Sequence, residues 1–352
     1  MTNNYGAAEA AAPFPQEDNA QRGISACTLK VIAIITMLID HVAAALILRA
    51  LVYANTSGSF VTSENYDAWY TIYYVMRGIG RMAFPVFCFF IVEGFQHTRS
   101  VPKYALRLLI FAIISEVPFD VALYHSWFSL SYNNVYFTLL LGLLAIWGMD
   151  FLEQKLQEVL IKSGHRGQAQ SFSGRNTSAR GNTSSRGNAS VQGSAAGQNN
   201  TTGQRGNSSA QNKNKSKSLY GKKWASEIAK ADDSLQKKYK FVQITGNLAI
   251  ALTAMLVAEY VLCTDYGAVG VLTILIMYLM REKPMAGFAV AVVFLGLFSD
   301  TLEFAALLML IPLHLYNGTR GRQIKYLFYA FYPVHLTIIA LVGFAMGMTM
   351  IY

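Results

Sequence analysis

Ionisable residues lie inside several of the apolar stretches of this 352-residue chain. Asp40 and His41 are adjacent in the first stretch. Arg81 lies in the second stretch, with Glu93 near its end, and His335 lies in the last. On insertion scales, a charged side chain at the centre of a membrane-spanning helix costs at least about 2.5–3.5 kcal/mol. We therefore take these five side chains as the candidate catalytic residues of a site inside a membrane.

Two histidines are the members of this set that can exchange a proton near neutral pH. At 1.5 Å per helical residue, Asp40, Arg81 and His335 lie roughly 14–16 Å from the end of their stretches, close to the middle of a bilayer. We predict His41, or alternatively His335, as a general base, and an Asp40–Arg81 ion pair beside it. Neighbouring helical residues point about 100° apart, so a partner helix must orient His41. Two other interpretations stay open: an ion pair that only sets helix registry, and histidines that only pack.

Basic residues gather in two of the short polar connections, and they suit a phosphate-bearing ligand. Arginine forks and backbone N–H groups of a glycine-containing loop both bind phosphate oxygens. The alternative is the ordinary excess of positive charge on cytoplasmic loops. The predicted cofactor-binding residues are Arg99, Lys103, Arg107, Asn317, Arg320, Arg322 and Lys325.

Motifs for other chemistries are missing from the sequence. The segment Arg77–Arg81 reads Arg-Gly-Ile-Gly-Arg, but no strand precedes it and it lies within an apolar stretch, so it is no dinucleotide fingerprint. No Cys/His spacing suits zinc, and we predict no metal site. Neither a P-loop nor a Gly-x-Ser-x-Gly elbow occurs. The three cysteines, Cys27, Cys88 and Cys263, are far apart, which excludes a disulfide-framed domain.

Composition assigns the chain to the membrane proteins. Apolar residues make up 53% and charged residues only 14%, against about 25% in soluble domains. The formal net charge of +9 comes from one polar insert, which holds 16 of the 29 Lys and Arg residues and only four acids. A charge confined to such an insert gives no basic face for nucleic acid, and we expect no nucleic-acid partner.

The apolar stretches predict an all-α bundle of about nine membrane spans, since roughly 20 apolar residues cross the hydrocarbon core. They divide the chain into a disordered tail (1–26), four helices (27–152), a low-complexity basic loop predicted to be disordered (153–240) and five helices (241–352). Three stretches in the last set are short for a membrane span: Tyr266–Met280, Met285–Phe298 and Thr301–Tyr316. The predicted spans are Leu29–Val52, Tyr70–Phe95, Tyr104–Tyr124, Val135–Phe151, Gln243–Leu262, Tyr266–Met280, Met285–Phe298, Thr301–Tyr316 and Tyr326–Tyr352.

Positive charge alternates between the connections and predicts their orientation. Arg99–Arg107, Arg281–Lys283 and Arg320–Lys325 carry Lys and Arg. The connections without Lys or Arg are Tyr53–Trp69, His125–Asn134, Cys263–Asp265 and Ser299–Asp300. By the positive-inside rule, the N-terminus and the 153–240 loop are cytoplasmic and the C-terminus is outside. We therefore expect a multi-pass protein of the bacterial inner membrane, in contact with lipid.

Several blocks of residues carry a resemblance to a known family. They begin with Leu29-Lys-Val-Ile-Ala-Ile-Ile-Thr-Met-Leu-Ile-Asp-His41 and with Gly80-Arg-Met-Ala-Phe-Pro-Val-Phe, which leads to Val92-Glu-Gly-Phe-Gln-His-Thr-Arg99. Further blocks are Ser115-Glu-Val-Pro-Phe-Asp120, Asp265-Tyr-Gly267, Leu315-Tyr-Asn-Gly-Thr-Arg-Gly321 and Phe331-Tyr-Pro-Val-His-Leu336. In this order, over nearly every span, the chain resembles the TraX family of conjugal-transfer membrane proteins. The five candidate catalytic residues fall on matched positions.

The resemblance implies a transmembrane acetyltransferase. The best-known member of the TraX family is linked to N-terminal acetylation of conjugative pilin, and the family looks related to larger membrane acyltransferases. Acetyl-CoA is then the expected acyl donor and co-substrate, with no tightly bound cofactor. The acceptor would be the amine or hydroxyl of a pilin-like protein, or of an envelope glycan or lipid. The rival readings are a proton-coupled transporter, which the midplane charges would serve, and a non-catalytic subunit of a conjugation or secretion apparatus.

Overall fold

A computed structural model describes residues 23–56, 59–124, 126–127, 129, 131–176, 233–322 and 325–347. All regular elements in these ranges are helices, and two isolated bridges are the only extended pairings. This confirms the all-α, membrane-spanning fold class. The predicted disorder of most of the tail and of residues 177–232 falls outside the described residues. Ile24 and Ser25, which we had placed in the tail, are described and ordered against the rest of the protein.

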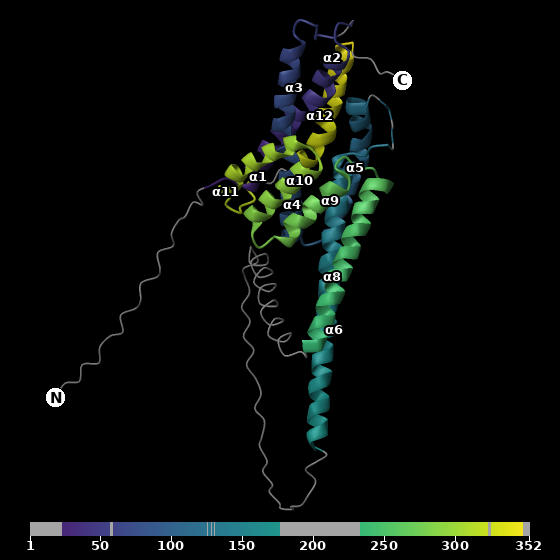
Figure 1. The fold of residues 1–352 in the computed structure, drawn as a ribbon, viewed down its shortest axis with the longest axis vertical. Helices are drawn as coiled ribbons and strands as arrows, with labels where there is room; N and C mark the ends of the chain where they lie inside the picture. The colour runs from purple at the N-terminus through teal and green to yellow at the C-terminus, as the bar shows by residue number, and fades with distance from the viewer. Residues whose placement is uncertain are drawn as a thin grey trace, which may run out of the picture. The chain divides into compact units, whose positions relative to one another are not determined.

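The described residues form two compact units, and the larger one combines residues up to Leu144 with residues from Ala254 onward. Figure 1 shows its helices gathered around α1 and α4. Ser25 accepts a hydrogen bond from the Thr28 N–H and so caps the start of α1. The helices of this unit, besides the start of α6, are α1 (Ala26–Val42), α2 (Leu48–Val52), α3 (Tyr66–Gly80), α4 (Ala83–His97), α5 (Val101–Phe119), α9 (Gly267–Leu279), α10 (Pro284–Phe298), α11 (Leu310–His314) and α12 (Lys325–Ala345).

Irregular turns interrupt the long helices beside ionisable residues. The π-helical segment η1 (Ala43–Ile47) follows Asp40 and His41, η2 (Asp120–Tyr124) begins at Asp120, and η3 (Val257–Val261) contains Glu259. The predicted second span is divided: α3 ends at Gly80 and α4 begins at Ala83, so Arg81 lies at the break. π-Bulges occur frequently at functional sites, because they redirect side chains within a helix.

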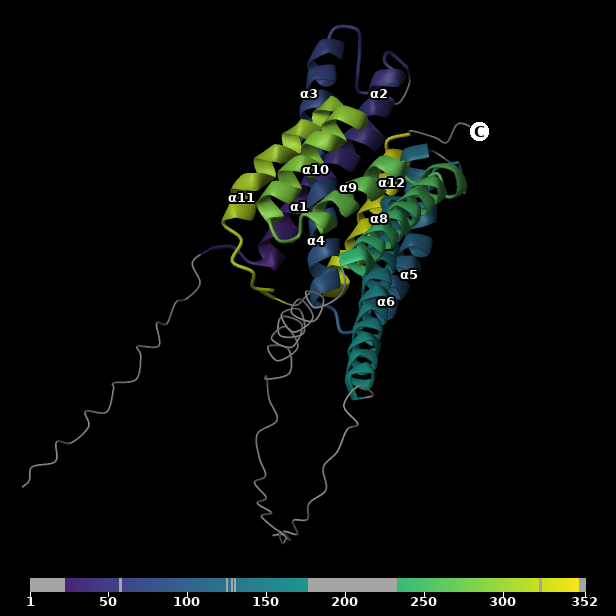
Figure 2. The ribbon, with the colours of Figure 1, turned by 60° about the horizontal axis from the view of Figure 1, so that its bottom comes forward.

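Five helical runs are long and apolar enough to cross a membrane: Ala26–Val52, Tyr66–His97, Val135–Leu160, Ser234–Val261 and Tyr326–Ala345. The run formed by α5 and η2 is also long, but Lys103, Arg107, Glu116 and Asp120 make it more polar. Three further apolar helical runs, Gly267–Leu279, Pro284–Phe298 and Thr301–His314, are shorter than the roughly 20 residues that a span needs. The last of these begins as the 3₁₀ helix η4 (Thr301–Met309). Figure 2 shows α9, α10 and α11 as neighbours.

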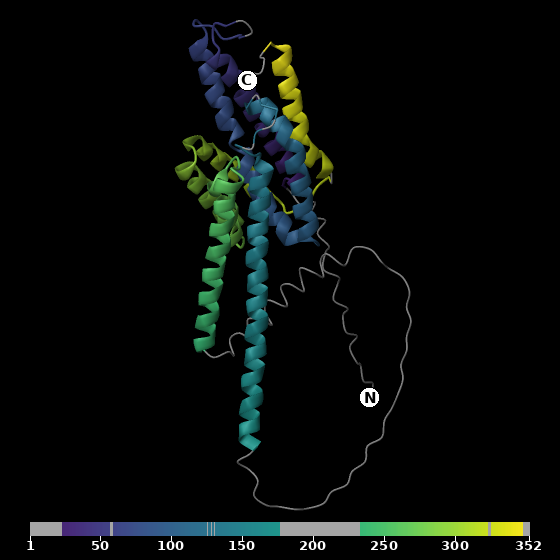
Figure 3. The same ribbon diagram turned by 90° about the vertical axis from the view of Figure 1, so that its right-hand side faces the viewer.

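The smaller unit, 145–253, consists of parts of two long helices, α6 (Val135–Asn176) and α8 (Asp233–Leu256), which run side by side in Figure 3. Gly246 lies against Leu152, and Gly148 lies against Ile250, so small residues let the two backbones approach. The predicted loop boundaries were too wide here, because α6 continues to Asn176 and α8 already begins at Asp233. Polar helical turns that extend a span carry no apolar signal, which explains the difference.

Two backbone pairings join connections that lie far apart in the sequence. The Asn133 N–H donates to the Cys263 carbonyl and the Asp265 N–H to the Asn133 carbonyl, both at 2.9 Å, which joins two connections without Lys or Arg. Ile24 pairs with Tyr316, which joins the start of α1 to the basic 315–322 connection. Each pairing unites segments predicted for the same side of the membrane.

Gly80 offers a test of the packing of α3 on α1. A Cβ at this position would lie 2.2 Å from the Asp40 Cβ, so Gly80→Ala should lower the free energy of unfolding by about 1–3 kcal/mol. Gly78 is a matched control on the same helix, because its Cβ would meet only the Leu302 Cδ2 at 3.9 Å. Gly78→Ala should therefore be neutral or stabilising by about 0.5–1 kcal/mol. Thermal unfolding in detergent compares the two, and equal stabilities would contradict this packing.

Candidate functional site

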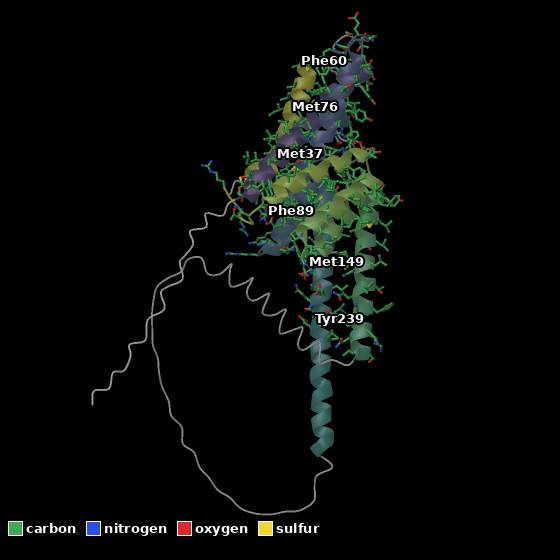
Figure 4. The ribbon with its side chains drawn as sticks, turned by 60° about the vertical axis from the view of Figure 1, so that its left-hand side comes forward. Met37, Phe60, Met76, Phe89, Met149 and Tyr239 are labelled. Atoms are coloured by element: carbon green, nitrogen blue, oxygen red, sulfur yellow. The ribbon has the colours of Figure 1, made fainter. Side chains whose placement is uncertain are left out.

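A cavity of about 270 Å³ lies inside the larger unit, at the level of Asp40 and His41. In Figure 4, Met37 on its wall lies between Met76 and Phe89 along the bundle. The lining residues come from α1, α2, α3, α4, α6 and α12, from η1 and η2, and from the connections at Arg81 and at Asp265. They include Asp40, His41, Arg77, Arg81, Phe84, Tyr124, Val135, Asp265, Tyr266 and Tyr332. Tyr124, Val135 and Asp265 lie at the ends of helices that meet the connections without Lys or Arg. The cavity therefore reaches from the middle of the bundle toward the side predicted to be outside.

The ion pair beside His41 differs from the prediction. Asp40 Oδ2 lies 2.6 Å from Arg77 Nη1, not beside Arg81, so the Asp40–Arg81 pair is wrong. Arg77 lies one helical turn before Arg81, and the Arg81 N–H donates to the Arg77 carbonyl at 3.1 Å, yet the two guanidinium groups bind carboxylates of different segments. Distance along the sequence gives the depth of a residue but not the helix face that it occupies, and this is why the depth estimate selected the wrong arginine.

Arg81 instead connects the broken second span to the short helices. Its Nη1 lies 3.2 Å from Glu303 Oε1 and its Nη2 lies 3.4 Å from Asp300 Oδ2. It also donates to the Tyr266 hydroxyl at 3.4 Å, while the Tyr266 ring stacks on Phe84 at 3.6 Å. Glu303 is fully buried, and a buried carboxylate without a cation would be strongly unfavourable. Arg81 is thus a positioning residue for one wall of the cavity.

The two candidate histidines meet across α1 and α12, as their equal depth predicted. His41 Nδ1 lies 2.7 Å from His335 Nε2, and the rings stack with centroids 4.9 Å apart. His335 Nδ1 lies 2.7 Å from the Phe331 carbonyl, which can only accept a hydrogen bond, so Nδ1 carries the proton. Nε2 of neutral His335 is then an acceptor, and His41 Nδ1 is the donor to it.

This chain of hydrogen bonds leaves the other His41 nitrogen, Nε2, with the lone pair. His41 lines the cavity, and no other described side chain hydrogen-bonds to its ring. A proton taken up at Nε2 would produce an imidazolium whose Nδ1–H is held by the lone pair of His335. The arrangement resembles the way a third group orients the base of a catalytic triad, with a histidine where a carboxylate usually stands.

Glu93 does not belong to this cavity. It lies toward the other end of α4, where its carboxylate accepts a hydrogen bond from the Tyr316 hydroxyl. Burial and this hydrogen bond raise the pKa of Tyr316 above its ordinary value. Ten residues of helix separate Glu93 from Ala83, or roughly 15 Å. We therefore reassign Glu93 from the predicted catalytic set to the end of the bundle that holds the basic connections.

The predicted phosphate-binding residues divide into two groups. Arg107 and Arg320 face the cluster around Glu93: Arg107 interacts with Tyr329, and Arg320 with Lys30 and Tyr316. The buried Nε of Arg107 has no partner among the described residues. Arg99, Lys103 and Arg322 are exposed, and the Asn317 Oδ1 accepts hydrogen bonds inside its own loop from Thr319. The side chain of Lys325 lies outside the described residues. None of the six whose side chains are described lines the cavity.

Comparison with known proteins decides the family. The TraX protein family matches residues 25–163 and 228–343, which is most of the chain. The chain belongs to the TraX family. The curated relative "Probable fimbrial assembly protein FimC, serogroup H1" of Dichelobacter nodosus is 38% identical over 135 residues. That alignment covers 35% of this chain and 45% of the relative, so the chain spans about half the length of FimC. No solved structure matches the chain.

Sequence reasoning missed several lining residues of this TraX-family protein. Asp265 and Tyr266 follow the fifth span in a short connection, and Tyr332 lies three residues before His335. Their signal was present, since Asp265-Tyr-Gly267 and Phe331-Tyr-Pro-Val-His-Leu336 are two of the blocks that carry the resemblance. Other acids within the spans have structural roles. Glu116 accepts from the Asn134 amide, Asp120 accepts from the Ser129 N–H, and Glu259 accepts from the Ala268 N–H.

Metal-binding geometry is missing from the described residues, where no group of three His, Cys, Asp or Glu side chains converges. The titratable side chains that line the cavity are instead Asp40, His41, Arg77, Arg81, Tyr124, Asp265, Tyr266 and Tyr332, and His335 hydrogen-bonds to His41 behind them. This arrangement can hold a polar substrate and exchange one proton with it.

A double-mutant cycle tests the pairing at the cavity. Asp40→Asn and Arg77→Gln should be coupled by about 0.5–3 kcal/mol, because each removes the partner of the other. Asp40→Asn combined with Arg81→Gln is the matched control and should be closer to additive. Unfolding free energies in detergent measure both cycles. A larger coupling for the Arg81 cycle would restore the originally predicted pair.

Proposed function

We propose that this TraX-family protein is an integral membrane acyltransferase, which transfers an acetyl group from a thioester such as acetyl-CoA to an envelope acceptor. The observation that carries the proposal is the His41–His335 pair, with a lone pair at His41 Nε2 on the wall of a polar cavity. The Asp40–Arg77 and Arg81–Glu303 ion pairs involve other residues of the same cavity wall. The membrane location of the chain agrees with an acceptor in the envelope.

In the proposed reaction, the acceptor amine or hydroxyl enters the cavity and His41 Nε2 removes its proton. The acceptor nitrogen or oxygen then bonds to the thioester carbonyl carbon, and the carbon–sulfur bond breaks. The leaving thiolate takes the proton back from His41, so the base is regenerated. His335 is a positioning residue in this scheme, because it touches His41 but does not line the cavity.

The two substrates would approach from opposite sides of the inner membrane. Tyr124, Val135 and Asp265 mark the side without Lys and Arg, from which the acceptor would enter. Arg107 and Arg320 mark the basic side, where the phosphates of the donor would bind. Lys30, which interacts with Arg320, and His41 both belong to α1, roughly 16 Å apart along the helix. The thioester arm of the donor would span this distance.

The relative from Dichelobacter nodosus suggests the type of acceptor. Its printed name describes a probable fimbrial assembly protein, so a pilin-like subunit is the first acceptor to test. The same name also suits a non-catalytic assembly subunit, which is the second candidate function. A subunit of that kind would not need the proton-accepting nitrogen of His41.

Replacement of His41 tests the general base. His41→Ala should lower acetyl transfer by about 10²–10⁴-fold, the usual contribution of a positioned base. The assay supplies purified protein with radiolabelled acetyl-CoA and an envelope fraction from cells that lack the protein. His314→Ala is the control, because His314 is exposed at the end of α11. Full transfer by the His41 variant would refute the base. Absence of transfer by folded wild-type protein would favour the assembly subunit.

The donor site has a separate test. Arg107→Gln should raise KM for acetyl-CoA about tenfold, or roughly 1.4 kcal/mol, and leave kcat unchanged, because it removes one charge from the donor phosphates. Arg281→Gln is the control, since Arg281 belongs to another basic connection and donates to the Tyr278 carbonyl. Equal KM values for the two variants would exclude Arg107 from the donor site.

A further inference from the structure

Tyr332 has a buried hydroxyl that no hydrogen bond satisfies. Its side chain is only 2% exposed, and the hydroxyl has no hydrogen-bond partner among the described residues. A buried polar group left in this state costs about 1–3 kcal/mol. Tyr332 also lines the same cavity as His41. An unsatisfied donor beside a reactive base is available to a ligand.

Packing against aromatic neighbours fixes the position of this ring. Tyr332 meets His41 edge-on with ring centroids 5.6 Å apart and His335 with the same separation. A third edge contact, to Tyr136, has a centroid separation of 5.2 Å. The contacts come from α1, α6 and α12 itself, so the hydroxyl is held relative to His41 without a hydrogen bond of its own.

The start of α6 polarises the Tyr332 hydroxyl. Val135 is the first residue of this helix, and its N–H approaches the Tyr332 oxygen without forming a full hydrogen bond. The next N–H groups are satisfied, because Tyr136 N donates to the Asn134 Oδ1 and Phe137 N to the Asn134 carbonyl. The partial positive charge of a helix N-terminus therefore lies behind the hydroxyl oxygen and strengthens its O–H as a donor.

Other tyrosines near the two histidines have ordinary structural partners. The Tyr136 hydroxyl donates to the Tyr329 carbonyl at 3.0 Å. The Tyr266 hydroxyl accepts from Arg81. Tyr332 differs from both, because it lines the cavity and its buried hydroxyl has no hydrogen-bond partner among the described residues. This contrast argues for a role in binding a substrate rather than in packing.

We propose that the Tyr332 hydroxyl is the oxyanion donor of the site: it hydrogen-bonds the carbonyl oxygen of the acyl thioester. The inference rests on the proposed function. When the acceptor attacks, electrons of the C=O bond move to this oxygen, and the negative charge is stabilised by the Tyr332 O–H with Val135 N–H behind it. As the C=O bond re-forms, the thiolate leaves and is protonated by His41. Tyr332 keeps its own proton throughout, so no further reactant is required.

Tyr332→Phe removes the hydroxyl and keeps the ring that packs against both histidines. It should lower kcat for acetyl transfer from radiolabelled acetyl-CoA about 10²-fold, the usual loss when one oxyanion donor is removed, with KM nearly unchanged. Tyr136→Phe is the matched control: it removes a buried hydroxyl from a neighbouring ring that does not line the cavity, and should keep wild-type kcat within a few fold. Thermal unfolding of both variants confirms that they are folded.

Fluorinated tyrosines provide a second measurement with the hydroxyl retained. A fluorotyrosine at position 332 has a more acidic O–H, so kcat should change with the acidity of the ring, whereas the same residue at position 136 should have no effect. Wild-type kcat in Tyr332→Phe, or equal losses in Tyr332→Phe and Tyr136→Phe, would overturn the oxyanion role and leave the acyltransferase proposal intact. Absence of transfer by wild-type protein would overturn both proposals.

Discussion

Burial of charge in an apolar environment is the constraint on which this structure depends. Each ionised side chain within a span needs a partner from another helix or connection. Asp40 therefore binds Arg77 across α1 and α3, and Glu303 binds Arg81 across η4 and the end of α3. These pairs connect segments that lie far apart in the sequence. They also provide partners for three of the charged side chains that line the cavity, Asp40, Arg77 and Arg81.

The same constraint applies to the two arginines of the second span. Arg77 and Arg81 lie one helical turn apart, on nearly the same face. Arg77 nevertheless binds Asp40 of α1, whereas Arg81 binds Asp300 and Glu303 at the start of the short helices. Gly80, between them, lacks a Cβ where Asp40 approaches most closely. Two successive arginines thus connect α3 to segments at opposite ends of the sequence.

The histidine pair is held by hydrogen bonds between uncharged groups and not by an ion pair. The Phe331 carbonyl is available to His335 on the same helix, where Thr337 likewise bonds back to the Pro333 carbonyl. Pro333 lies inside α12 and cannot donate a backbone hydrogen bond. The carbonyl that its missing N–H leaves without a helical donor is that of Tyr329, which accepts from the Tyr136 hydroxyl at 3.0 Å instead. The Phe331 carbonyl orients His335, His335 orients His41, and one tautomer of each ring is selected without a buried carboxylate.

Sequence alone determined the class of the protein, the order of its apolar helices, the family resemblance and the depth of the residues that meet. Apolar length and charge count depend only on composition along the chain, and depth follows from a constant helical rise. The sequence did not determine which arginine binds Asp40, that Glu93 lies at the other end of the bundle, or that Tyr332 and Asp265 line the cavity. Those depend on helix rotation, on the π-helical turns and on the break at Arg81. Rotation and breaks arise from contacts between distant segments, and only the tertiary structure decided them.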